Sequence, residues 1–258
     1  MENAKALTVQ KAAPYRGTTA NPWVHHPEVF SKDEADKLFA YFFKQPWVAP
    51  QDKACPNLGG YYLAYGTPYS GRNSKEKKEV AGPIPTTPGW NSLLKKVQDK
   101  FRAPVNYVQC HLYAPGHAVH PHFDPGGMIV PMLTLGQERT FRVGGSSPQC
   151  YPGTPAYVLE QTCRDISTHI PADEYLMKHG DLLVFIGGAT IHSMYPTAKD
   201  PQFNRNGYDW RISILFRWTP PAMAQYGAGD KAHKKEMKQQ YAEALEQWRK
   251  DNPGGDVL

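Results

Sequence analysis

The chain has 258 residues, with 29 Lys and Arg against 24 Asp and Glu, and it is 40% hydrophobic and 12% aromatic. This length and apolar content can fill a core without disulfides or a structural metal, which argues against a wholly disordered chain. The 22 Gly and 24 Pro follow no repeat, so they favour many strands and turns over a helical bundle. The net charge of +5 permits a polyanionic partner without establishing one.

Hydropathy and cysteine usage indicate an intracellular protein, cytoplasmic or nuclear, with no membrane partner. The apolar run Leu182–Ile186 is far too short to cross a bilayer, and the N-terminus carries no apolar signal segment. The cysteines form no CxxC pair and are interpreted as reduced thiols. They are Cys55, Cys110, Cys150 and Cys163.

The first 104 residues are expected to flank a core. Residues 1–20 mix small and basic residues without periodicity, which predicts a flexible tail. A helix is predicted from Ser31, because SKDE can form a capping box with Glu34. The segment 59–66 alternates like a strand, and 90–101 predicts a second helix. The apolar residues expected on the inner helix faces are Leu38, Phe39, Phe42, Phe43, Leu93, Leu94 and Val97.

From Tyr107 to Trp218 the sequence predicts short strands separated by turns, with no intervening helix. The segments are YVQCHLY, HAVHPHFD, MIVPMLTL, ERTFRVGG, YVLEQ, DEYLMKHGDLLVFIGG, IHSMY and WRISILFRW. Such a series predicts an antiparallel sandwich or barrel.

The segment 231–250 predicts a C-terminal helix with an apolar stripe. The stripe either docks on this subunit, giving a monomer, or pairs two subunits in a dimer. Its residues are Met237, Tyr241, Leu245 and Trp248.

Three side chains in the strand-rich region match a metal-ligating set. His122 and Asp124 stand two residues apart, so in an extended segment both project from one face. His192 follows the apolar strand that begins near Asp181. Two histidines and one carboxylate form the facial triad of non-haem Fe(II) oxygenases, which leaves iron positions open for a cosubstrate and O2.

The last predicted strand adds a cationic element. On a strand, Arg211, Ser213 and Arg217 face one way, opposite the apolar Ile212, Ile214 and Phe216. Guanidinium groups on an inward face require anionic partners, and a dicarboxylate such as 2-oxoglutarate would satisfy them. Arg205 is a competitor for this role, but it lies in a polar, turn-like run.

Several motifs together resemble the AlkB family of Fe(II)/2-oxoglutarate dioxygenases over roughly residues 105–218. They are His111-Leu-Tyr113-Ala-Pro-Gly116, His122-Phe-Asp124, Leu135-Gly136, Phe141, His192 and the run RISILFR. The spacings from Tyr113 to His122 and from Arg211 to Arg217 both fit that family. His111 stands where the family usually has Asn, and Ser213 and Leu215 replace Asn and Thr.

The resemblance implies Fe(II) ligation and catalysis by His122, Asp124 and His192. It implies that Arg211 pairs with the distal carboxylate of 2-oxoglutarate and that Arg217 lies close to this cosubstrate. Tyr113 would donate a hydrogen bond to it. The remaining residues of the expected cosubstrate site are His111 and Ser213.

The first substrate hypothesis is oxidative demethylation of an N-alkylated nucleobase in DNA or RNA. Residues 62–71 resemble the nucleotide-recognition lid of the AlkB family, and Lys75, Lys77 and Lys78 add basic character nearby. Enzymes of this kind extrude the base and stack it on aromatic side chains. The tyrosines available for stacking, or for ordinary strand packing, are Tyr61, Tyr62, Tyr65 and Tyr69.

Two other functions remain open. The first is hydroxylation or demethylation of a small molecule or a protein side chain, because Asp124 is followed by Pro125-Gly126-Gly127 rather than by further acidic residues. The second is a non-enzymatic sugar- or metal-binding sandwich of cupin type, which would not need the arginine pair.

We therefore predict a mainly β (α+β) protein with a double-stranded β-helix, or jelly-roll, core at residues 105–219. Residues 1–20 form the tail, 21–104 the N-terminal helices and substrate lid, and 220–258 the C-terminal helix. The cofactor set is Fe(II), 2-oxoglutarate and O2.

Overall fold

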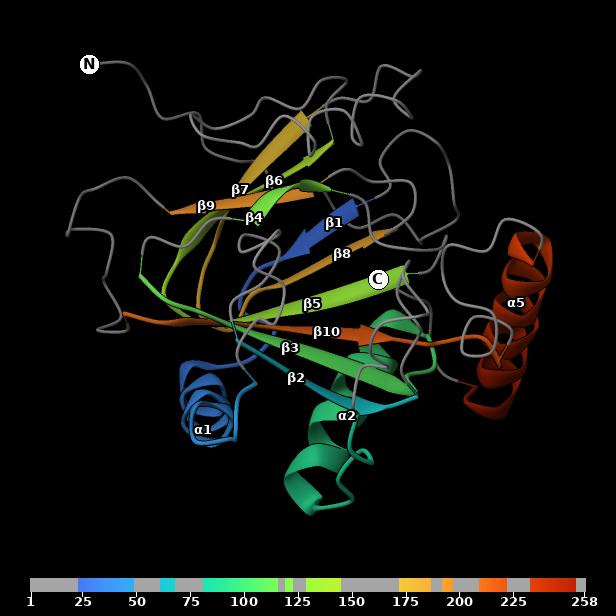
Figure 1. Ribbon diagram of the computed structural model, residues 1–258. Coiled ribbons are helices and arrows are strands. Elements are labelled where there is room, and N and C mark those ends of the chain that lie inside the picture. The colour runs from blue at the N-terminus through green and yellow to red at the C-terminus, as the bar shows by residue number, and fades with distance from the viewer. Residues whose placement is uncertain are drawn as a thin grey trace.

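The computed structural model describes residues 23–48, 61–67, 81–115, 119–122, 129–144, 172–186, 192–196, 209–221 and 233–253. Two antiparallel sheets of six and four strands form their centre (Figure 1). In spatial order the larger sheet holds β1 (Trp23–His26), β8 (Leu182–Ile186), β5 (Ile129–Gly136), β10 (Arg211–Arg217), β3 (Tyr107–Tyr113) and β2 (Tyr61–Gly66). The smaller sheet holds β4 (Val119–His122), β9 (His192–Pro196), β6 (Arg139–Gly144) and β7 (Ala172–Met177).

The strand pairing is that of a jelly roll. Counted from β3 to β10, the first strand pairs with the eighth, the second with the seventh, the third with the sixth and the fourth with the fifth. This nested antiparallel pairing wraps an eight-stranded ribbon into two facing sheets. It confirms the predicted fold class. The N-terminal part adds β1 and β2 as the outer strands of the larger sheet.

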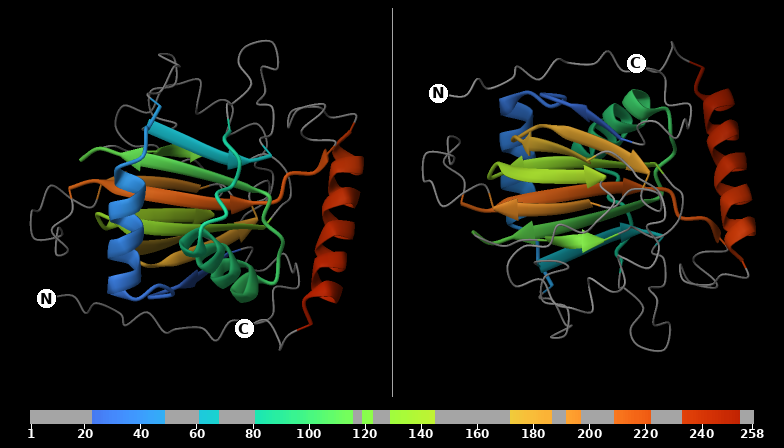
Figure 2. Two further views of the ribbon diagram at one scale, coloured as in Figure 1. Left: turned by 90° about the horizontal axis from the view of Figure 1, so that it is seen from below. Right: turned by 90° about the horizontal axis from the view of Figure 1, so that it is seen from above.

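Two helices lie together on one side of the larger sheet (Figure 2). They are α1 (Lys32–Phe43) and α2 (Pro88–Phe101). The predicted capping box between Ser31 and Glu34 is present, so α1 begins as expected. Phe43, the last residue of α1, departs from the prediction because it is 42% exposed, although its ring stacks on Phe39 and meets the ring of Trp210 edge-on.

Alternate residues of the central strands separate two apolar clusters. On the face that we call the helix side, residues of the larger sheet pack with α1 and α2; they include Leu133, Leu135, Ile212, Ile214, Phe216, Phe39, Trp90 and Val97. On the opposite face, the inner side, they pack with the smaller sheet. That cluster includes Val130, Met132, Leu183, Phe185, Leu215, Phe141, Val143 and Met194.

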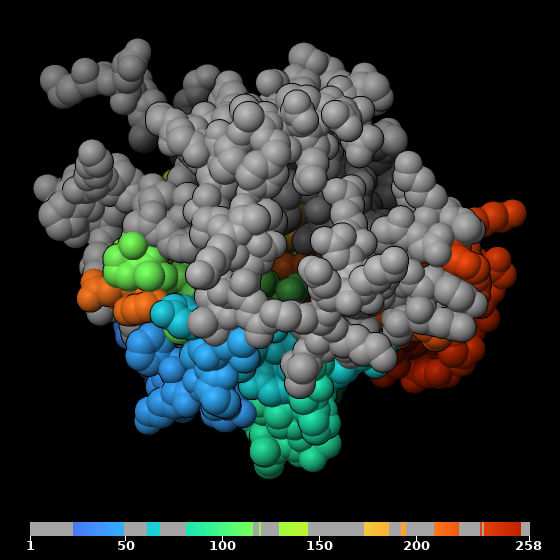
Figure 3. Space-filling model, in the orientation of Figure 1, coloured from blue at the N-terminus to red at the C-terminus, as the bar shows by residue number. Residues whose placement is uncertain are grey.

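The C-terminal helix α5 (Lys234–Asp251) packs on this same chain. Met237 is buried, and the amide of Ile129 donates a hydrogen bond of 3.1 Å to the Tyr241 hydroxyl. The guanidinium of Arg102 lies 5.3 Å from the ring centroid of Trp248. The predicted apolar stripe therefore docks at least in part on its own subunit. Figure 3 shows α5 apart from the side that carries α1 and α2.

Some predictions fall on parts of the chain outside the described residues. These are the tail at 1–20, the segment YVLEQ, three of the four cysteines and Arg205. Cys110 is a buried free thiol, as expected, and burial raises its pKa. Among the described helices none is long and apolar enough to cross a bilayer.

Candidate active site

Two of the three predicted metal ligands meet at one end of the smaller sheet. β4 ends at His122, β9 begins at His192, and the two residues are direct partners across the antiparallel ladder. Opposed residues of such a ladder have Cα atoms about 4.5–5.5 Å apart. Positions seventy residues apart in the chain are thus neighbours, at what we call the histidine end. The His122 side chain and Asp124 lie outside the described part of the chain.

The His192 ring lies between the two sheets. It stacks on Phe141 of β6 with 5.8 Å between ring centroids, and its centroid lies 4.6 Å from that of Phe185 of β8. The residue is only 5% exposed. Phe141 comes from the smaller sheet and Phe185 from the larger one, so the imidazole lies on the inner side and is held by apolar rings from both sheets. An imidazole held in such a shielded position is a suitable ligand for a first-row transition metal.

A buried cationic group marks the opposite end, the arginine end, where β10 begins. Arg211 is fully buried; its Nε donates to Ser213 Oγ at 3.2 Å and its Nη2 donates to Thr134 Oγ1 at 2.9 Å. Its Nη1 has no hydrogen-bond partner among the described residues. No carboxylate in that part of the chain forms an ion pair with it. Two hydroxyl groups therefore orient the guanidinium and leave one of its nitrogens available.

The charge on Arg211 is costly where it lies. Burial and, to a smaller extent, the nearby charge of Arg139 lower its pKa to about 9. Tyr113 and Asp181 act in the opposite direction. A pKa of about 9 still leaves the group cationic at neutral pH. A buried cation without a counter-ion is unfavourable, so this site favours an anionic ligand.

The other predicted cosubstrate residues lie on the same inner side. His111 is the cross-strand partner of Ser213, and its ring stacks on Tyr113 at 5.9 Å between centroids. Tyr113 in turn is the partner of Arg211. Arg217 is buried, but it lies six residues along β10, beside Tyr107 at the other end of the strand. The structure thus brings Arg211, Ser213, His111 and Tyr113 together. It places Arg217 at the other end of β10, away from Arg211.

A second buried guanidinium, that of Arg139, was missed by sequence reasoning. Arg139 begins β6 and is fully buried. It shares the strand parity of Phe141 and Val143, both of which lie in the inner-side cluster. That parity was the available signal. Because RTFR also contains Arg142 on the opposite face, the segment resembles an ordinary half-exposed strand.

The tyrosines of the expected substrate lid divide between the two sides of the sheet. Tyr65 packs into the helix-side cluster, with 4.9 Å between its ring centroid and that of Trp90, and burial raises its pKa to about 12. Tyr61 is 40% exposed, and its ring centroid lies 6.4 Å from that of Trp210. Tyr62 is the cross-strand partner of His111, so it has inner-side parity. Tyr69 lies outside the described residues.

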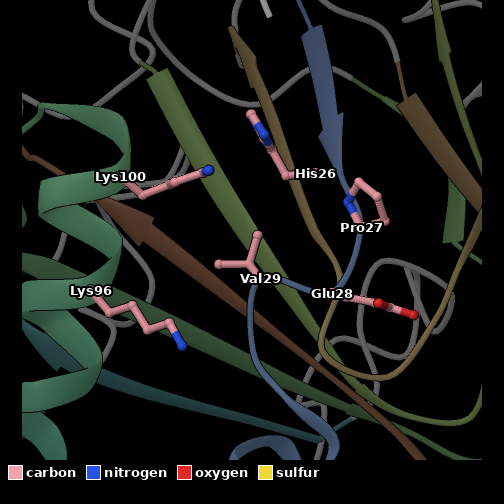
Figure 4. A pocket seen from close by; sticks show the side chains of 6 residues that line it. All are labelled: His26, Pro27, Glu28, Val29, Lys96 and Lys100. Carbon is pink, nitrogen blue, oxygen red and sulfur yellow. The ribbon is translucent and has the colours of Figure 1, made fainter. Parts of the chain in front are cut away.

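A pocket on the helix side is unrelated to these residues. It lies between β1 and α2 and is lined by His26, Pro27, Glu28, Val29, Lys96 and Lys100 (Figure 4). The centroid of the His26 ring lies 5.4 Å from that of the Phe101 ring, and burial, with smaller contributions from Lys100 and His25, lowers the pKa of His26 to about 4.

Comparison with known proteins gives structural matches only. No protein-family model matches the chain, and no curated protein matches its sequence. A prolyl-4-hydroxylase from Pseudomonas putida matches with 12% identity and a TM-score of 0.43, over 76% of this chain and 92% of the other. An oxidoreductase of the 2OG-Fe(II) oxygenase family from Burkholderia pseudomallei matches with 14% identity and a TM-score of 0.45, over 76% and 84%.

HygX from Streptomyces hygroscopicus, whose structure holds nickel and 2-oxoglutarate, matches with 12% identity and a TM-score of 0.41, over 77% of this chain and 82% of the other. At these identities and TM-scores the matches do not assign a function to this chain. The function of this chain is therefore inferred from its own residues.

Proposed function

We propose that this chain is an Fe(II)- and 2-oxoglutarate-dependent dioxygenase of AlkB type. It would hydroxylate or oxidatively demethylate its substrate, with an N-alkylated nucleobase in DNA or RNA as the first candidate. The observation that carries the proposal is the fully buried guanidinium of Arg211, which is held by two hydroxyls and has a free Nη1 among the described residues. The pairing of His122 with His192 at the opposite end supports it.

The donor set fits both groups. His122, Asp124 and His192 would hold Fe(II), since two imidazoles and one carboxylate leave open positions on the metal. When bound, Fe(II) supplies activation of O2, coupled to oxidative decarboxylation of 2-oxoglutarate to succinate and CO2 and to hydroxylation of a substrate C–H bond. Where that carbon is attached to nitrogen, the hydroxylated product releases an aldehyde and the dealkylated amine.

The chain's own residues bind and orient the cosubstrate. Arg211 would donate from Nη1 to its distal carboxylate, while Ser213 and Thr134 keep the guanidinium in place. Tyr113, beside it across the ladder, would donate its hydroxyl proton in a hydrogen bond. Apolar side chains on the inner side exclude water around these groups, which strengthens each charged contact.

A second candidate substrate class follows from the lid tyrosines. Tyr65 packs against Trp90 of α2, and Tyr61 also lies on the helix side. Of the three lid tyrosines within the described residues, only Tyr62 faces the inner side, where the site lies. A single aromatic residue is a small platform for an extruded base. This placement favours a small molecule or a protein side chain as the substrate of the same core.

Succinate release measured with two substrate panels tests the function. The first panel contains methylated DNA and RNA oligonucleotides, and the second contains metabolites and peptides. We expect stimulation above uncoupled turnover with one panel, and loss of that turnover in His192→Ala. Ser193→Ala, the next residue of β9, is the matched control and should retain it. If no oligonucleotide stimulates turnover, the nucleobase hypothesis is wrong; if no turnover of 2-oxoglutarate occurs at all, the dioxygenase proposal is wrong.

A further inference from the structure

His179 is a buried histidine that links α1 to the end of β5. Its side chain is 3% exposed, and it lies in the turn between β7 and β8. Nδ1 accepts a hydrogen bond of 2.7 Å from the amide of Gly136, the last residue of β5. Nε2 lies 2.9 Å from a carboxylate oxygen of Asp36 on α1. Both ring nitrogens therefore have partners, and these partners belong to different elements.

The bond to Gly136 extends the pairing of β5 with β8 beyond the strands themselves. After the last ladder pair, the amide of Thr134 donates to the carbonyl oxygen of Asp181 at 2.9 Å. The carbonyl oxygen of Thr134 accepts from the amide of Gly180, also at 2.9 Å. At Gly136, two residues further along, the imidazole takes the place of a backbone carbonyl. His179 thus holds the last residue of β5 where the backbone pairing has ended.

The position of Arg211 depends on this end of β5. Gly136 is the direct partner of Arg211 across the ladder, and Thr134 Oγ1 accepts from its Nη2 at 2.9 Å. Gly136 has a left-handed φ of 83°, and a Cβ atom there would collide with the carbonyl oxygen of Trp210 and with the ring of Phe39. Because the packing is this close, a displacement of Gly136 would also displace the start of β10 and with it the guanidinium.

The bond from Gly136 requires a neutral imidazole. Since Nδ1 accepts from the Gly136 amide, the ring proton lies on Nε2 and is donated to Asp36. A second proton, on Nδ1, would point at the amide and break that bond. Burial lowers the pKa of His179 from 6.5, while Asp36 and Asp181 act in the opposite direction. Lys32, which pairs with the other oxygen of Asp36, also lowers it.

We propose that His179 is a positioning residue for cosubstrate binding: the neutral ring fixes Gly136 and thereby the guanidinium of Arg211. It acts through the end of β5 and is not itself a ligand of the cosubstrate. Affinity for 2-oxoglutarate is then complete while the ring is neutral and falls as the pH drops through the pKa of His179. Because burial lowers that pKa, the loss occurs below pH 6.5. This inference rests on the proposed function.

The test is the pH profile of cosubstrate affinity. The dissociation constant of 2-oxoglutarate is measured on Mn²⁺-saturated protein without O2, between pH 8 and pH 5. His179→Asn places an amide oxygen near the position of Nδ1, so it can accept from Gly136 but cannot titrate. It should bind within a few-fold of wild type at pH 8. His179→Leu has no acceptor and should bind about tenfold more weakly at pH 8, as expected for the loss of one hydrogen bond.

The ratio of the wild-type dissociation constant to that of His179→Asn isolates the histidine. Titration of the metal ligands and of the cosubstrate affects both proteins and cancels in this ratio. The ratio should rise about tenfold as the pH falls, because only wild type loses the bond to Gly136. This comparison also decides the test if His179→Leu does not fold.

Two further variants sharpen the assignment. Asp36→Asn keeps an oxygen that can accept from Nε2 but removes the charge that raises the pKa of His179, so the rise in the ratio should move to lower pH. His26→Gln is the matched control, because the His26 ring is also on the helix side but packs on Phe101 of α2. Its pH profile should match that of wild type.

The outcomes distinguish the inference from the proposed function. A ratio that stays constant from pH 8 to pH 5, in a wild type that binds 2-oxoglutarate, would overturn the role of His179 alone. So would equal losses in His179→Asn and His179→Leu at pH 8, since these would show a merely structural role for the ring. If metal-loaded wild type binds no 2-oxoglutarate at any pH, the proposed function fails and the role of His179 fails with it.

Discussion

The two sides of the larger sheet are built from alternate residues of the same strands, yet they differ in the polar side chains that they bury. On β10, Ile212, Ile214 and Phe216 enter the helix-side cluster, whereas Arg211 and Ser213 face inward. The helix side buries mainly apolar side chains. The inner side accepts a buried cation without a carboxylate partner among the described residues.

Asp181, in contrast to Arg211, is a buried ionisable residue whose two carboxylate oxygens both have partners within the fold. Asp181 is 1% exposed; one oxygen lies 3.0 Å from His25 Nε2 and accepts from the amide of Lys178, and the other accepts from the amide of Glu28. This carboxylate ties β1 to the turn before β8. The comparison with Arg211 teaches that a fully paired buried charge belongs to the scaffold, while a buried charge with an available donor indicates a ligand site.

The largest effect expected from this comparison is on ligand binding. Arg211→Gln should lower the affinity of the Mn²⁺-loaded protein for 2-oxoglutarate by about 100-fold or more, because the charged hydrogen bond from Nη1 to the distal carboxylate is lost. The free energy of unfolding without ligand should not fall by a similar amount, since the removed cation forms no ion pair within the described residues. Isothermal titration calorimetry measures the affinity, and thermal unfolding measures the stability. An unchanged affinity would contradict the assignment of Arg211 to the cosubstrate site.

A substitution on the helix-side face of β10 should lower stability and leave ligand binding nearly unchanged. Ile214→Ala should lower the free energy of unfolding by about 3 kcal/mol, because it leaves a cavity in the helix-side core. Affinity of the folded variant for 2-oxoglutarate should remain within a few-fold of wild type. Urea unfolding and calorimetry provide the measurements. Equal damage to binding from Ile214→Ala and Arg211→Gln would abolish the distinction between the two sides.

Two tyrosines of β2 give a smaller contrast. Tyr62→Ala should lower kcat/KM for the true substrate about tenfold, as expected for loss of one aromatic contact at the site. Tyr65→Phe should leave kcat/KM unchanged, since it keeps the ring packing against Trp90 on the helix side. Steady-state kinetics with the substrate found in the panels measure kcat/KM for both variants. A larger loss in Tyr65→Phe than in Tyr62→Ala would show that Tyr65, and not Tyr62, contacts the substrate.

A pH dependence is expected on the helix side. The pKa of His26 is about 4 when folded and returns to its ordinary value of 6.5 when unfolded. Below pH 6.5 the unfolded chain therefore binds a proton that the folded chain does not, so stability is lost as pH falls from 6.5 toward 4. Unfolding of wild type and His26→Gln between pH 8 and 4 should show a shallower slope in the variant; parallel curves would exclude this role.

Local patterns in the sequence predict much of the fold and part of the site. The alternation in RISILFR correctly separates Arg211 from Ile212, because strand parity is a two-residue signal. The capping box likewise predicts the start of α1, because it involves only Ser31 and Glu34, which are three residues apart. The pairing of His122 with His192 is different, since it depends on β4 and β9 meeting across the fold, and the facial-triad ligand set and the family resemblance indicated it without any local signal.

What the sequence did not reveal depends on long-range packing. The short strand at Trp23–His26 pairs with β8, about 160 residues later, and four residues carry too little periodicity to be recognised. Arg139 was missed because its burial comes from the opposite sheet. Tyr65 and Tyr62 have the same local sequence character, and only the position of Trp90 on α2 distinguishes packing from exposure to the site.

The central claim is that the inner side of the sandwich is a joint metal and dicarboxylate site. Titration of 2-oxoglutarate into the full-length protein, with and without Mn²⁺ and in the absence of O2, tests it most directly. The account predicts saturable binding of one equivalent that requires the metal and is lost in His192→Ala and Arg211→Gln. Absence of binding to the metal-loaded wild type, or binding that both variants retain, would contradict it.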